Sequence, residues 1–325
     1  MAPPLALFGL DPQALLDDVY FRADFLALHA HPDACDRLDA GDFRIGAAVR
    51  AIPGPIPGHT WPGQIWYDLE TPHGYGGPVA RDRAALEAGL AGWRARQRVA
   101  GRVAEFIRLH PCLNPEALTG LVDHLAFNRL TVMVDLRPSA PARRAGYSQS
   151  TRRFLRHAEK VLTVRRLGPT EGPLFQRLYD AMLERHGAEA RYAFPPAFHQ
   201  ALLEAPWCRT WVAEQAGEAV AASCFLATPS PVAHYHLGGG TEAGLRSHAQ
   251  FLLFETAFEH FAAAGQHWLH LGGGRTPSAD DSLWHFKTRF SPVQARFHVA
   301  GLIHTPDRFA ALGGSRDGRF LGWRG

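Results

Sequence analysis

The chain has 325 residues, more than a single hydrophobic core usually serves, and this length favours two domains. Its residues are 46% hydrophobic and 20% charged, a composition that excludes disordered and fibrous proteins, and its net charge of +3 excludes a protein whose whole surface binds polyanions. No run of about 18 apolar residues predicts a transmembrane helix, and the N-terminus lacks the basic start of a secretory signal, so we expect a cytoplasmic protein.

The first half of the sequence alternates between helical and strand patterns. Hydrophobic periodicity and breaker residues predict a helix over residues 12–30, strands over 43–52 and 64–69, a helix over 82–108 and a strand over 130–136. Four prolines between the first two strands predict a loop there.

A second cycle of similar order follows residues 137–148 (RPSAPARRAGYS), where the periodicity is lost. We therefore predict domains 1–147 and 148–325, with a C-terminal tail that is able to rejoin the first domain. The predicted elements place both halves in the α/β (α+β) fold class. The elements predicted in the second half are helices over 150–160, 171–186 and 248–264, and strands over 208–215, 219–227, 232–237 and 267–271.

The histidines and cysteines do not predict a metal site. The four cysteines are far apart and form no CxxC pair. His29 and His31 (HAHPD) read as a helix end, and His234 and His236 would share one face of a strand without an evident third ligand. No GxSxG motif predicts a nucleophile.

Residues 71–78 (TPHGYGGP) form a glycine-rich turn between a strand and a charged helix. Such turns can hold a ligand against the backbone, but this one has no lysine or serine in the arrangement that a phosphate loop requires. A plain turn, a phosphate cradle and the wall of a binding groove all stay open at this point.

Two glycine triplets, at 238–240 and 272–274, directly follow predicted strands, where backbone N–H groups can approach a ligand. The first triplet precedes a helix that starts near Ser247. An acyl-CoA-binding acetyltransferase normally carries an arginine or glutamine followed by GxG or GxA at such a junction. Here Gly244 and Arg246 occur in the reverse order, which weakens the case for coenzyme A.

Nine basic residues and one acid, Glu159, lie between Arg137 and Arg166. Such a cluster can neutralise the phosphates of a nucleotide or an RNA, and its affinity would fall with salt. The alternative is a solvated helix beside a linker. The candidate polyanion-binding or tRNA-binding residues are Arg143, Arg144, Arg152, Arg153, Arg156 and Lys160.

Only two of the 34 basic residues are lysines, and one of them, Lys287, lies in SLWHFKTRF at residues 282–290. A compact ammonium held against Phe286 and Phe290 could be oriented toward a developing negative charge. The alternative is an amphipathic strand or short helix with an exposed lysine. The survival of a lysine in an arginine-rich chain favours a functional role.

Together these segments resemble the FemAB family of peptidoglycan-bridge aminoacyltransferases. The resemblance runs through residues 71–77, 108–111, 131–136, 150–160 and 175–192, HYHLGGG, and the closing LGGG with SLWHFKTRF. It implies two tandem GNAT-like domains with mixed, mostly antiparallel sheets flanked by helices, the first on the acceptor side and the second on the donor side.

The resemblance also implies a reaction and its partners. An aminoacyl group would move from aminoacyl-tRNA to an amine of a peptidoglycan precursor, a UDP-linked or lipid-linked muropeptide. DNA would take no part, no cofactor would be needed, and any membrane contact would be peripheral, at the inner face. The residues expected to bind substrate are His73, Gly74, Gly76, Gly77, Arg191, Tyr192, Tyr235, His236, Phe286 and Arg289.

Aminolysis of an ester needs a base, a stabiliser for the developing oxyanion and a positioning surface. Lys287 matches a family lysine associated with the transferred group, and we expect it to stabilise the developing charge or the leaving hydroxyl. Asp68 or Glu70 is the expected base, and Tyr75 is expected to position the acceptor. No inserted coiled-coil arm is evident, so contact with tRNA would rest on residues 137–166.

Two other functions stay open. One is an acyl-CoA-dependent N-acyltransferase acting on a small amine or sugar, with acyl-CoA as the donor. The other is a non-catalytic protein that binds RNA or a cell-wall precursor.

Overall fold

The computed structural model describes residues 3–54, 63, 65–187, 193–276, 278 and 280–324. The chain divides into two compact units: unit 1 comprises residues 1–130 and 295–325, and unit 2 comprises residues 131–294. The boundary predicted after residue 147 lies inside unit 2. The chain passes from one unit to the other within strand β6 (His124–Asp135), where no change of composition marks the crossing.

Unit 1 is built on a sheet with the order β1-β2-β3-β5-β12, to which β4 adds by pairing with β2. All its pairs are antiparallel except β3 with β5. Its strands are β1 (Cys35–Asp39), β2 (Phe43–Ala51), β3 (Tyr67–Glu70), β4 (Val79–Ala80), β5 (Ala104–Arg108) and β12 (Gln294–Ile303). Its helices are α1 (Pro12–Leu15), α2 (Ala23–His29), α3 (Arg83–Val99) and α11 (Pro306–Ala311), with 3-10 turns at Val19–Phe21, Pro32–Ala34 and Pro115–Leu118.

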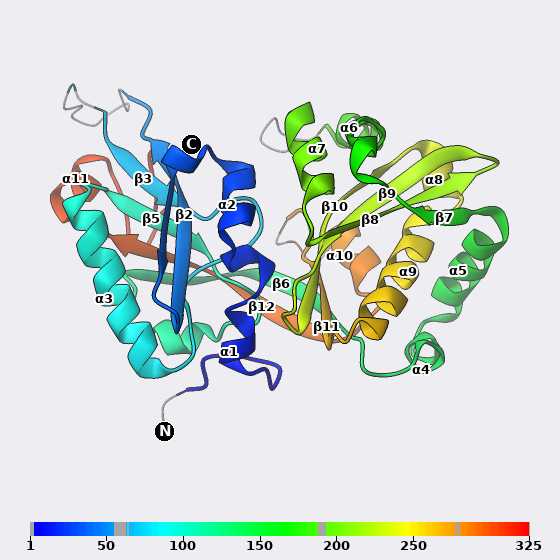
Figure 1. Ribbon diagram of the computed structural model, residues 1–325, viewed down its shortest axis with the longest axis horizontal. Coiled ribbons are helices and arrows are strands. Elements are labelled where there is room, and N and C mark those ends of the chain that lie inside the picture. The colour runs from blue at the N-terminus through cyan, green and yellow to red at the C-terminus, as the bar shows by residue number, and fades with distance from the viewer. Residues whose placement is uncertain are drawn as a thin grey trace. The chain divides into compact units, whose positions relative to one another are not determined.

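The long helix α3 covers the sheet of unit 1 because its apolar residues recur on one side. Leu86, Leu90 and Trp93 pack there against the buried side chains of β2 and β5. A second cluster brings the C-terminal tail into the same unit, where Phe320 and Trp323 pack with Phe309 of α11. Residues distant in sequence therefore complete this unit (Figure 1).

Unit 2 is built on a sheet with the order β6-β11-β10-β9-β8-β7, in which only β10 and β11 are parallel. Its further strands are β7 (Thr163–Arg166), β8 (Cys208–Gln215), β9 (Glu218–Leu226), β10 (Val232–Gly240) and β11 (Trp268–Gly272). Its helices are α4 (Ala140–Ala145), α5 (Gln149–Val161), α6 (Gly172–His186), α7 (Pro196–Glu204), α8 (Glu242–Arg246), α9 (Ala249–Ala263) and α10 (Ser282–Lys287), with a 3-10 turn at Pro169–Glu171.

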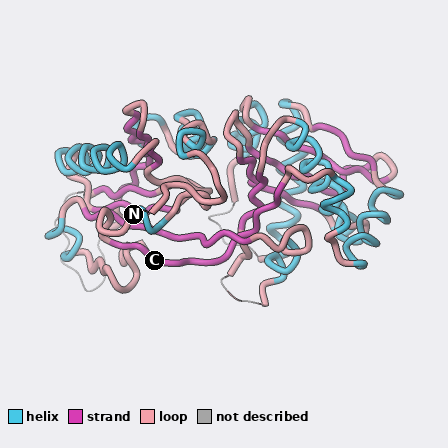
Figure 2. The backbone as a smooth tube through the Cα atoms, turned by 90° about the horizontal axis from the view of Figure 1, so that it is seen from below, coloured by secondary structure: helices cyan, strands magenta, loops and turns pink. Residues whose placement is uncertain are grey.

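Helix α9 is the central helix of unit 2. Its side chains Phe254, Phe258 and Phe261 are buried with Phe225 of β9, and α5 packs on its outer side through Leu155. Helices α6 and α7 cover the opposite face of the sheet (Figure 1), and Figure 2 shows the strands accompanied by helices in each unit. The predicted α/β class with mixed, mostly antiparallel sheets is confirmed.

Two predicted helices differ from the structure. The helix expected over residues 12–30 is two short helices and a 3-10 turn, because Asp11 and Asp18 each cap a new start through their carboxylates. The helix expected over 82–108 ends at Val99, and Gly101, with φ of 66°, turns the chain into strand β5. No helix among the described residues is long and apolar enough to cross a membrane.

Candidate functional site

Lys287 is the last residue of helix α10 in unit 2. The residue is only 5% exposed, and its Nζ donates a hydrogen bond to the carbonyl oxygen of Gly273 at 2.8 Å. The same nitrogen lies 5.4 Å from the ring centroid of Tyr235, within the range of a cation–π contact. The lysine singled out by the sequence is therefore a buried, positioned cation and not an exposed one.

Asp281 fixes the helix that carries Lys287. It is the N-cap of α10, and its carboxylate accepts hydrogen bonds from the backbone N–H groups of Trp284 and Thr276, both at 2.9 Å. Burial would raise the pKa of Asp281, but these amides outweigh burial and hold the pKa below its ordinary value. The sequence does hold a signal for this role, since an aspartate just before a helical segment is the ordinary sign of a cap.

The lysine lies where two neighbouring strands separate. Strands β10 and β11 pair only through Val232–His234 and Trp268–His270, whereas β10 continues to Gly240. Register shifts directly after these residues mark the separation in both strands. Among the described residues, the register pairs between β10 and β11 end at His234 and His270.

Tyr235 and Gly238 line this part of β10. Burial raises the pKa of the Tyr235 hydroxyl well above its ordinary value, so the hydroxyl is protonated at neutral pH. A Cβ atom at Gly238 would lie 2.5 Å from that hydroxyl oxygen and 3.1 Å from Ser223 Oγ. Gln250 Nε2 donates a hydrogen bond to Ser223 Oγ at 2.6 Å. The sequence predicted Tyr235 but gave no signal for Ser223 and Gln250, which come from β9 and α9.

Phe286 and Arg289, both expected to contact substrate, have different surroundings. Arg289 reaches the start of α5, where its Nη1 lies 3.4 Å from Ser150 Oγ and its guanidinium carbon 5.8 Å from the ring centroid of Phe154. Phe286 packs in the core of unit 2 against three rings with centroids 5.1 to 5.5 Å away, those of Phe251, Phe254 and Phe290. Phe286 thus positions Lys287 through packing.

His236 is partly buried on β10. Arg191 and Tyr192 fall outside the described residues.

The glycine-rich turn at residues 71–78 belongs to unit 1 and is held by other residues of that unit. The backbone of Gly76 is hydrogen-bonded to that of residues 108 and 110, both at 2.8 Å. Tyr75 packs edge-on against the rings of Tyr20 and Phe297, with centroids 5.5 and 5.1 Å away. Burial raises the pKa of Tyr75 well above its ordinary value and lowers the pKa of His73 to about 4, so both side chains are neutral at pH 7.

The glycines of this turn allow tight packing. A Cβ atom at Gly74 would lie 2.5 Å from the ring of Tyr20, and one at Gly77 would lie 2.9 Å from Leu109 Cδ2. Both glycines have positive φ, 117° and 106°, and a Cβ at Gly76 would lie 3.0 Å from the methyl group of Thr71. Because side chains of unit 1 fill these spaces, the structure favours a packed turn over a phosphate cradle.

The two expected bases of unit 1 differ in accessibility. Asp68 is fully buried and accepts hydrogen bonds from Trp323 Nε1 at 2.6 Å and from the guanidinium of Arg324. Burial raises its pKa, although Arg324 and Trp323 oppose the rise. Glu70 is partly exposed and pairs with Arg108 at 2.5 Å. The carboxylate of Asp68 is thus enclosed, and Glu70 is the one that a substrate can reach.

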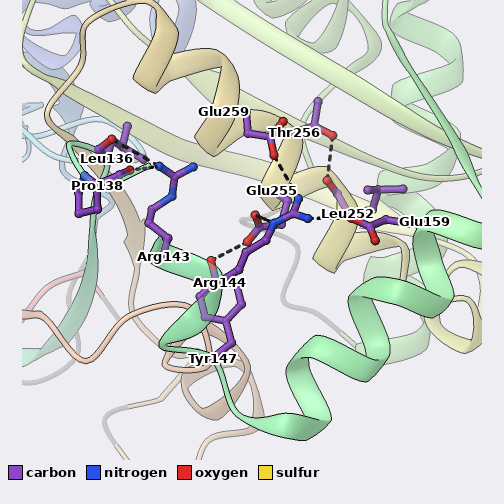
Figure 3. A network of polar contacts seen from close by, with 10 residues as sticks. All are labelled: Leu136, Pro138, Arg143, Arg144, Tyr147, Glu159, Leu252, Glu255, Thr256 and Glu259. Atoms are coloured by element: carbon purple, nitrogen blue, oxygen red, sulfur yellow. Dashed lines mark hydrogen bonds and ion pairs between the residues drawn. The ribbon is translucent and has the colours of Figure 1, made fainter. Parts of the chain in front are cut away.

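The basic segment between residues 137 and 166 is partly neutralised by acids of unit 2 (Figure 3). Arg144 contacts three carboxylates, at 2.9 Å from Glu255, 3.0 Å from Glu159 and 3.1 Å from Glu259. Arg143 donates to the carbonyl oxygens of Pro138 and Leu136, at 2.6 and 3.4 Å. Among the described residues, Arg152, Arg153, Arg156 and Lys160 of α5 form no ion pair with an acid.

Comparisons with known proteins place this geometry in a class. Residues 142–287 match the family model described as an acetyltransferase (GNAT) domain. The fold is similar to the crystal structure of FemX, with a TM-score of 0.69, 11% identity, and coverage of 91% of this chain and 96% of that one. A search of curated protein sequences gives no match.

Two further solved structures are similar. One is the C-terminal domain of a putative lysylphosphatidylglycerol synthetase from Agrobacterium fabrum, with a TM-score of 0.58, 17% identity and coverage of 92% of both chains. The other is L-PGS from Bacillus licheniformis, with a TM-score of 0.55, 13% identity and coverage of 86% of both chains.

The GNAT-domain match and the fold together define the class: the protein is an acyltransferase of the GNAT fold. The matched segment includes the separating strands β10 and β11 and ends at Lys287. The predicted GNAT-like fold and the predicted acyltransferase class are confirmed.

Proposed function

We propose that the protein moves an aminoacyl group from aminoacyl-tRNA to an amine of a peptidoglycan precursor peptide. The observation that carries this proposal is the buried ammonium of Lys287, held by Gly273 at the point where β10 and β11 separate. The similarity to FemX over 91% of the chain supports it. So does the similarity to a putative lysylphosphatidylglycerol synthetase, whose name states that an aminoacyl group is attached.

In this reaction the acceptor amine attacks the ester carbonyl of the donor. A C–N bond forms, the C–O bond to the ribose breaks, the amine loses a proton to a base and the ribose oxygen gains one. Negative charge develops first on the carbonyl oxygen and then on the leaving oxygen. A fixed cation in a site of low dielectric stabilises such charge without reorganisation, and we assign this role to Lys287.

The remaining roles follow from burial and position. We propose that the protonated hydroxyl of Tyr235, whose ring centroid lies 5.4 Å from Lys287 Nζ, donates a hydrogen bond to the donor. We propose Glu70 over Asp68 as the base, since Asp68 is enclosed by the tail. Tyr75 and the turn with His73 are proposed to contact the acceptor peptide.

Mass spectrometry of the acceptor tests the proposed reaction. The protein is incubated with a UDP-linked muropeptide and a pool of charged tRNA, with acetyl-CoA in a parallel tube. We expect the mass of one aminoacyl group to be added in the first tube. No added mass in either tube would contradict the proposal.

The Lys287→Met variant tests the role of the lysine. We expect turnover to fall at least about tenfold, because the oxyanion loses its cation while the apolar part of the side chain is kept. Lys287→Arg, which retains the charge but changes the shape, should retain more activity than Lys287→Met. Circular dichroism would establish that both variants fold. A fall of less than tenfold in Lys287→Met would contradict the assignment.

The acetyltransferase (GNAT) domain match favours one second candidate, an acyl-CoA-dependent N-acyltransferase acting on a small amine or sugar. Helix α8 occupies the connection between β10 and α9, where a glycine-rich pyrophosphate loop would be expected. An acetyl mass on the acceptor, or thermal stabilisation of the protein by acetyl-CoA, would favour this candidate.

A further inference from the structure

The ion pairs of unit 2 divide the basic segment into two sets of cations. Arg144 and Arg165 are compensated, the first by three carboxylates and the second by Glu171 and Glu214, both at 2.8 Å. Arg137 pairs with Asp135 at 2.7 Å. These side chains stabilise the structure of the unit, and because carboxylates already compensate their charges, they attract an anionic ligand only weakly.

The second set lies on helix α5. At 100° per residue, Arg153, Arg156 and Lys160 fall within about 40° of one line along the helix, opposite the buried residues Leu155 and Ala158. All three are exposed, and none has a carboxylate partner among the described residues. They are therefore uncompensated and aligned, and we call them the α5 stripe.

Two more arginines border the α5 stripe. Arg152 donates to the carbonyl oxygens of Ala145 and Tyr147, which leaves its charge uncompensated. Arg289 contacts Ser150 at the start of α5 and stands two residues after Lys287 in the chain. The stripe thus begins beside the segment that carries the catalytic candidate.

The chemistry of this surface fits the phosphate backbone of a nucleic acid. Arg153 and Lys160 are separated by about 10 Å along the helix, a length over which one strand presents about three phosphates. A helix that lies in a membrane surface also needs bulky apolar residues beside its cations. Among the described residues, the exposed large hydrophobic side chains lie elsewhere, for example at Val99 and Phe127, and none is on α5. The surface therefore favours a nucleic acid over an anionic bilayer.

We infer that the α5 stripe, bordered by Arg152 and Arg289, binds the phosphate backbone of the RNA donor, and that Arg144, whose charge three carboxylates compensate, does not. This inference rests on the proposed function, which makes a charged tRNA the donor. It assigns the body of the RNA to an outer helix of unit 2 and the aminoacyl end to the surroundings of Lys287.

Binding of uncharged tRNA to the full chain tests the inference. Affinity is measured by fluorescence anisotropy at several salt concentrations for the parent and for Arg153→Gln/Arg156→Gln/Lys160→Gln. Each lost phosphate contact lowers the slope of log K against log salt by roughly 0.7 to 0.9, so the triple variant should lose about two units of slope. We also expect it to bind at least about tenfold more weakly near physiological salt.

A matched control removes the same charge elsewhere. Arg98, Arg177 and Arg319 are exposed and lie on α3, on α6 and in the tail. The variant Arg98→Gln/Arg177→Gln/Arg319→Gln should retain the parent's slope. Equal losses in the two triple variants, or no loss in the α5 variant, would overturn the inference.

Kinetics separate this inference from the proposed function. In the α5 variant, KM for full-length aminoacyl-tRNA should rise about tenfold with kcat unchanged, whereas a short 2′(3′)-O-aminoacyl adenosine donor should react as with the parent. If the parent transfers nothing from tRNA but the α5 variant still loses RNA binding, the proposed function fails and the binding surface stands. If the variant loses binding to phosphatidylglycerol vesicles and retains RNA binding, the surface is a membrane contact and the inference is overturned.

Discussion

Glu255 is 1% exposed, and its carboxylate accepts hydrogen bonds from the Tyr147 hydroxyl at 2.5 Å and from Arg144 Nε at 2.9 Å. A buried carboxylate is costly unless such partners compensate it. Burial and the nearby carboxylate of Glu255 raise the pKa of Tyr147 well above its ordinary value, so the tyrosine is a permanent donor here. The sequence suggests that Arg144 contacts a ligand. In the structure its side chain instead links α4 to α9 (Figure 3).

Substitution of Glu255 by glutamine tests this link. We expect Glu255→Gln to lower the free energy of unfolding by about 2 kcal/mol, because Arg144 and Tyr147 lose a buried anionic acceptor. Glu259→Gln removes a partner of the same arginine that is 53% exposed, and should change stability by less than about 0.5 kcal/mol. Urea unfolding of both variants measures the difference. Similar losses in the two variants would argue against a special role for the buried pair.

At the scale of elements, Gly239 sets how closely α6 approaches β10. A Cβ atom there would lie 2.3 Å from the carbonyl oxygen of Leu178 and 2.5 Å from the Cα atom of Tyr179, both backbone atoms of α6. Backbone atoms cannot move aside as the end of a side chain can. The glycine triplet after residue 237 is therefore needed for the packing of helix on strand as well as for the shape of the site.

A pair of glycine substitutions tests this packing. Gly239→Ala should destabilise the protein by about 1 to 3 kcal/mol, because α6 must shift away from β10. Gly92→Ala in α3 should instead stabilise it by about 0.5 to 1 kcal/mol, since that position is exposed and helical and its Cβ would lie 3.9 Å from Leu38 Cδ2. Thermal unfolding checks both signs, and a loss of stability in Gly92→Ala would contradict the comparison.

Elements with a long, regular pattern could be predicted from the sequence. Strand β8 has the predicted bounds, 208–215. Helix α6 differs from prediction by one residue at its start and α9 by one residue at each end, because their hydrophobic periodicity is uninterrupted. The join between α3 and β5 was missed, since the residues after Val99 continue an apolar pattern that fits either element.

The candidate site was predicted only in part. Lys287 stood out because lysine is rare in this chain, and Tyr235 followed from its motif. Asp68 is enclosed by Arg324, which lies 256 positions later in the chain, and no local sequence pattern predicts a contact between residues so far apart. The same holds for the carboxylates that compensate Arg144, two of which come from α9, more than 100 residues downstream.

At the scale of the whole molecule, the C-terminal tail completes the core of unit 1. Leu321 and Trp323 are buried with Ile52 and Val103, and Trp323 and Arg324 hold the carboxylate of Asp68. The tail therefore contributes apolar packing and charge compensation to residues that precede it by more than 200 positions, such as Val103 and Asp68.

The variant Arg324→Met measures how much the tail stabilises the protein by compensating the charge of Asp68. It should lower the free energy of unfolding by about 2 kcal/mol at pH 7, because Asp68 stays buried without its cation. The pKa of Asp68, already raised by burial, should rise further, so the variant's deficit is present at neutral pH and shrinks as the pH falls through that pKa. Adding Asp68→Asn should restore part of the loss. Urea unfolding at about pH 7 and pH 4 tests this, and a deficit that grows in acid would contradict it.

The insertion of unit 2 into the sequence of unit 1 also sets an order of events on the ribosome. Strand β5 receives its neighbour β12 only after the intervening residues 131–294 have been synthesised. At roughly 5 to 20 residues per second, the nascent first segment waits on the order of ten to thirty seconds with that strand edge unpaired. Unit 2 is continuous in sequence and can fold during this interval. The newly made chain is therefore most exposed to aggregation, and most in need of a chaperone, before its last 31 residues appear.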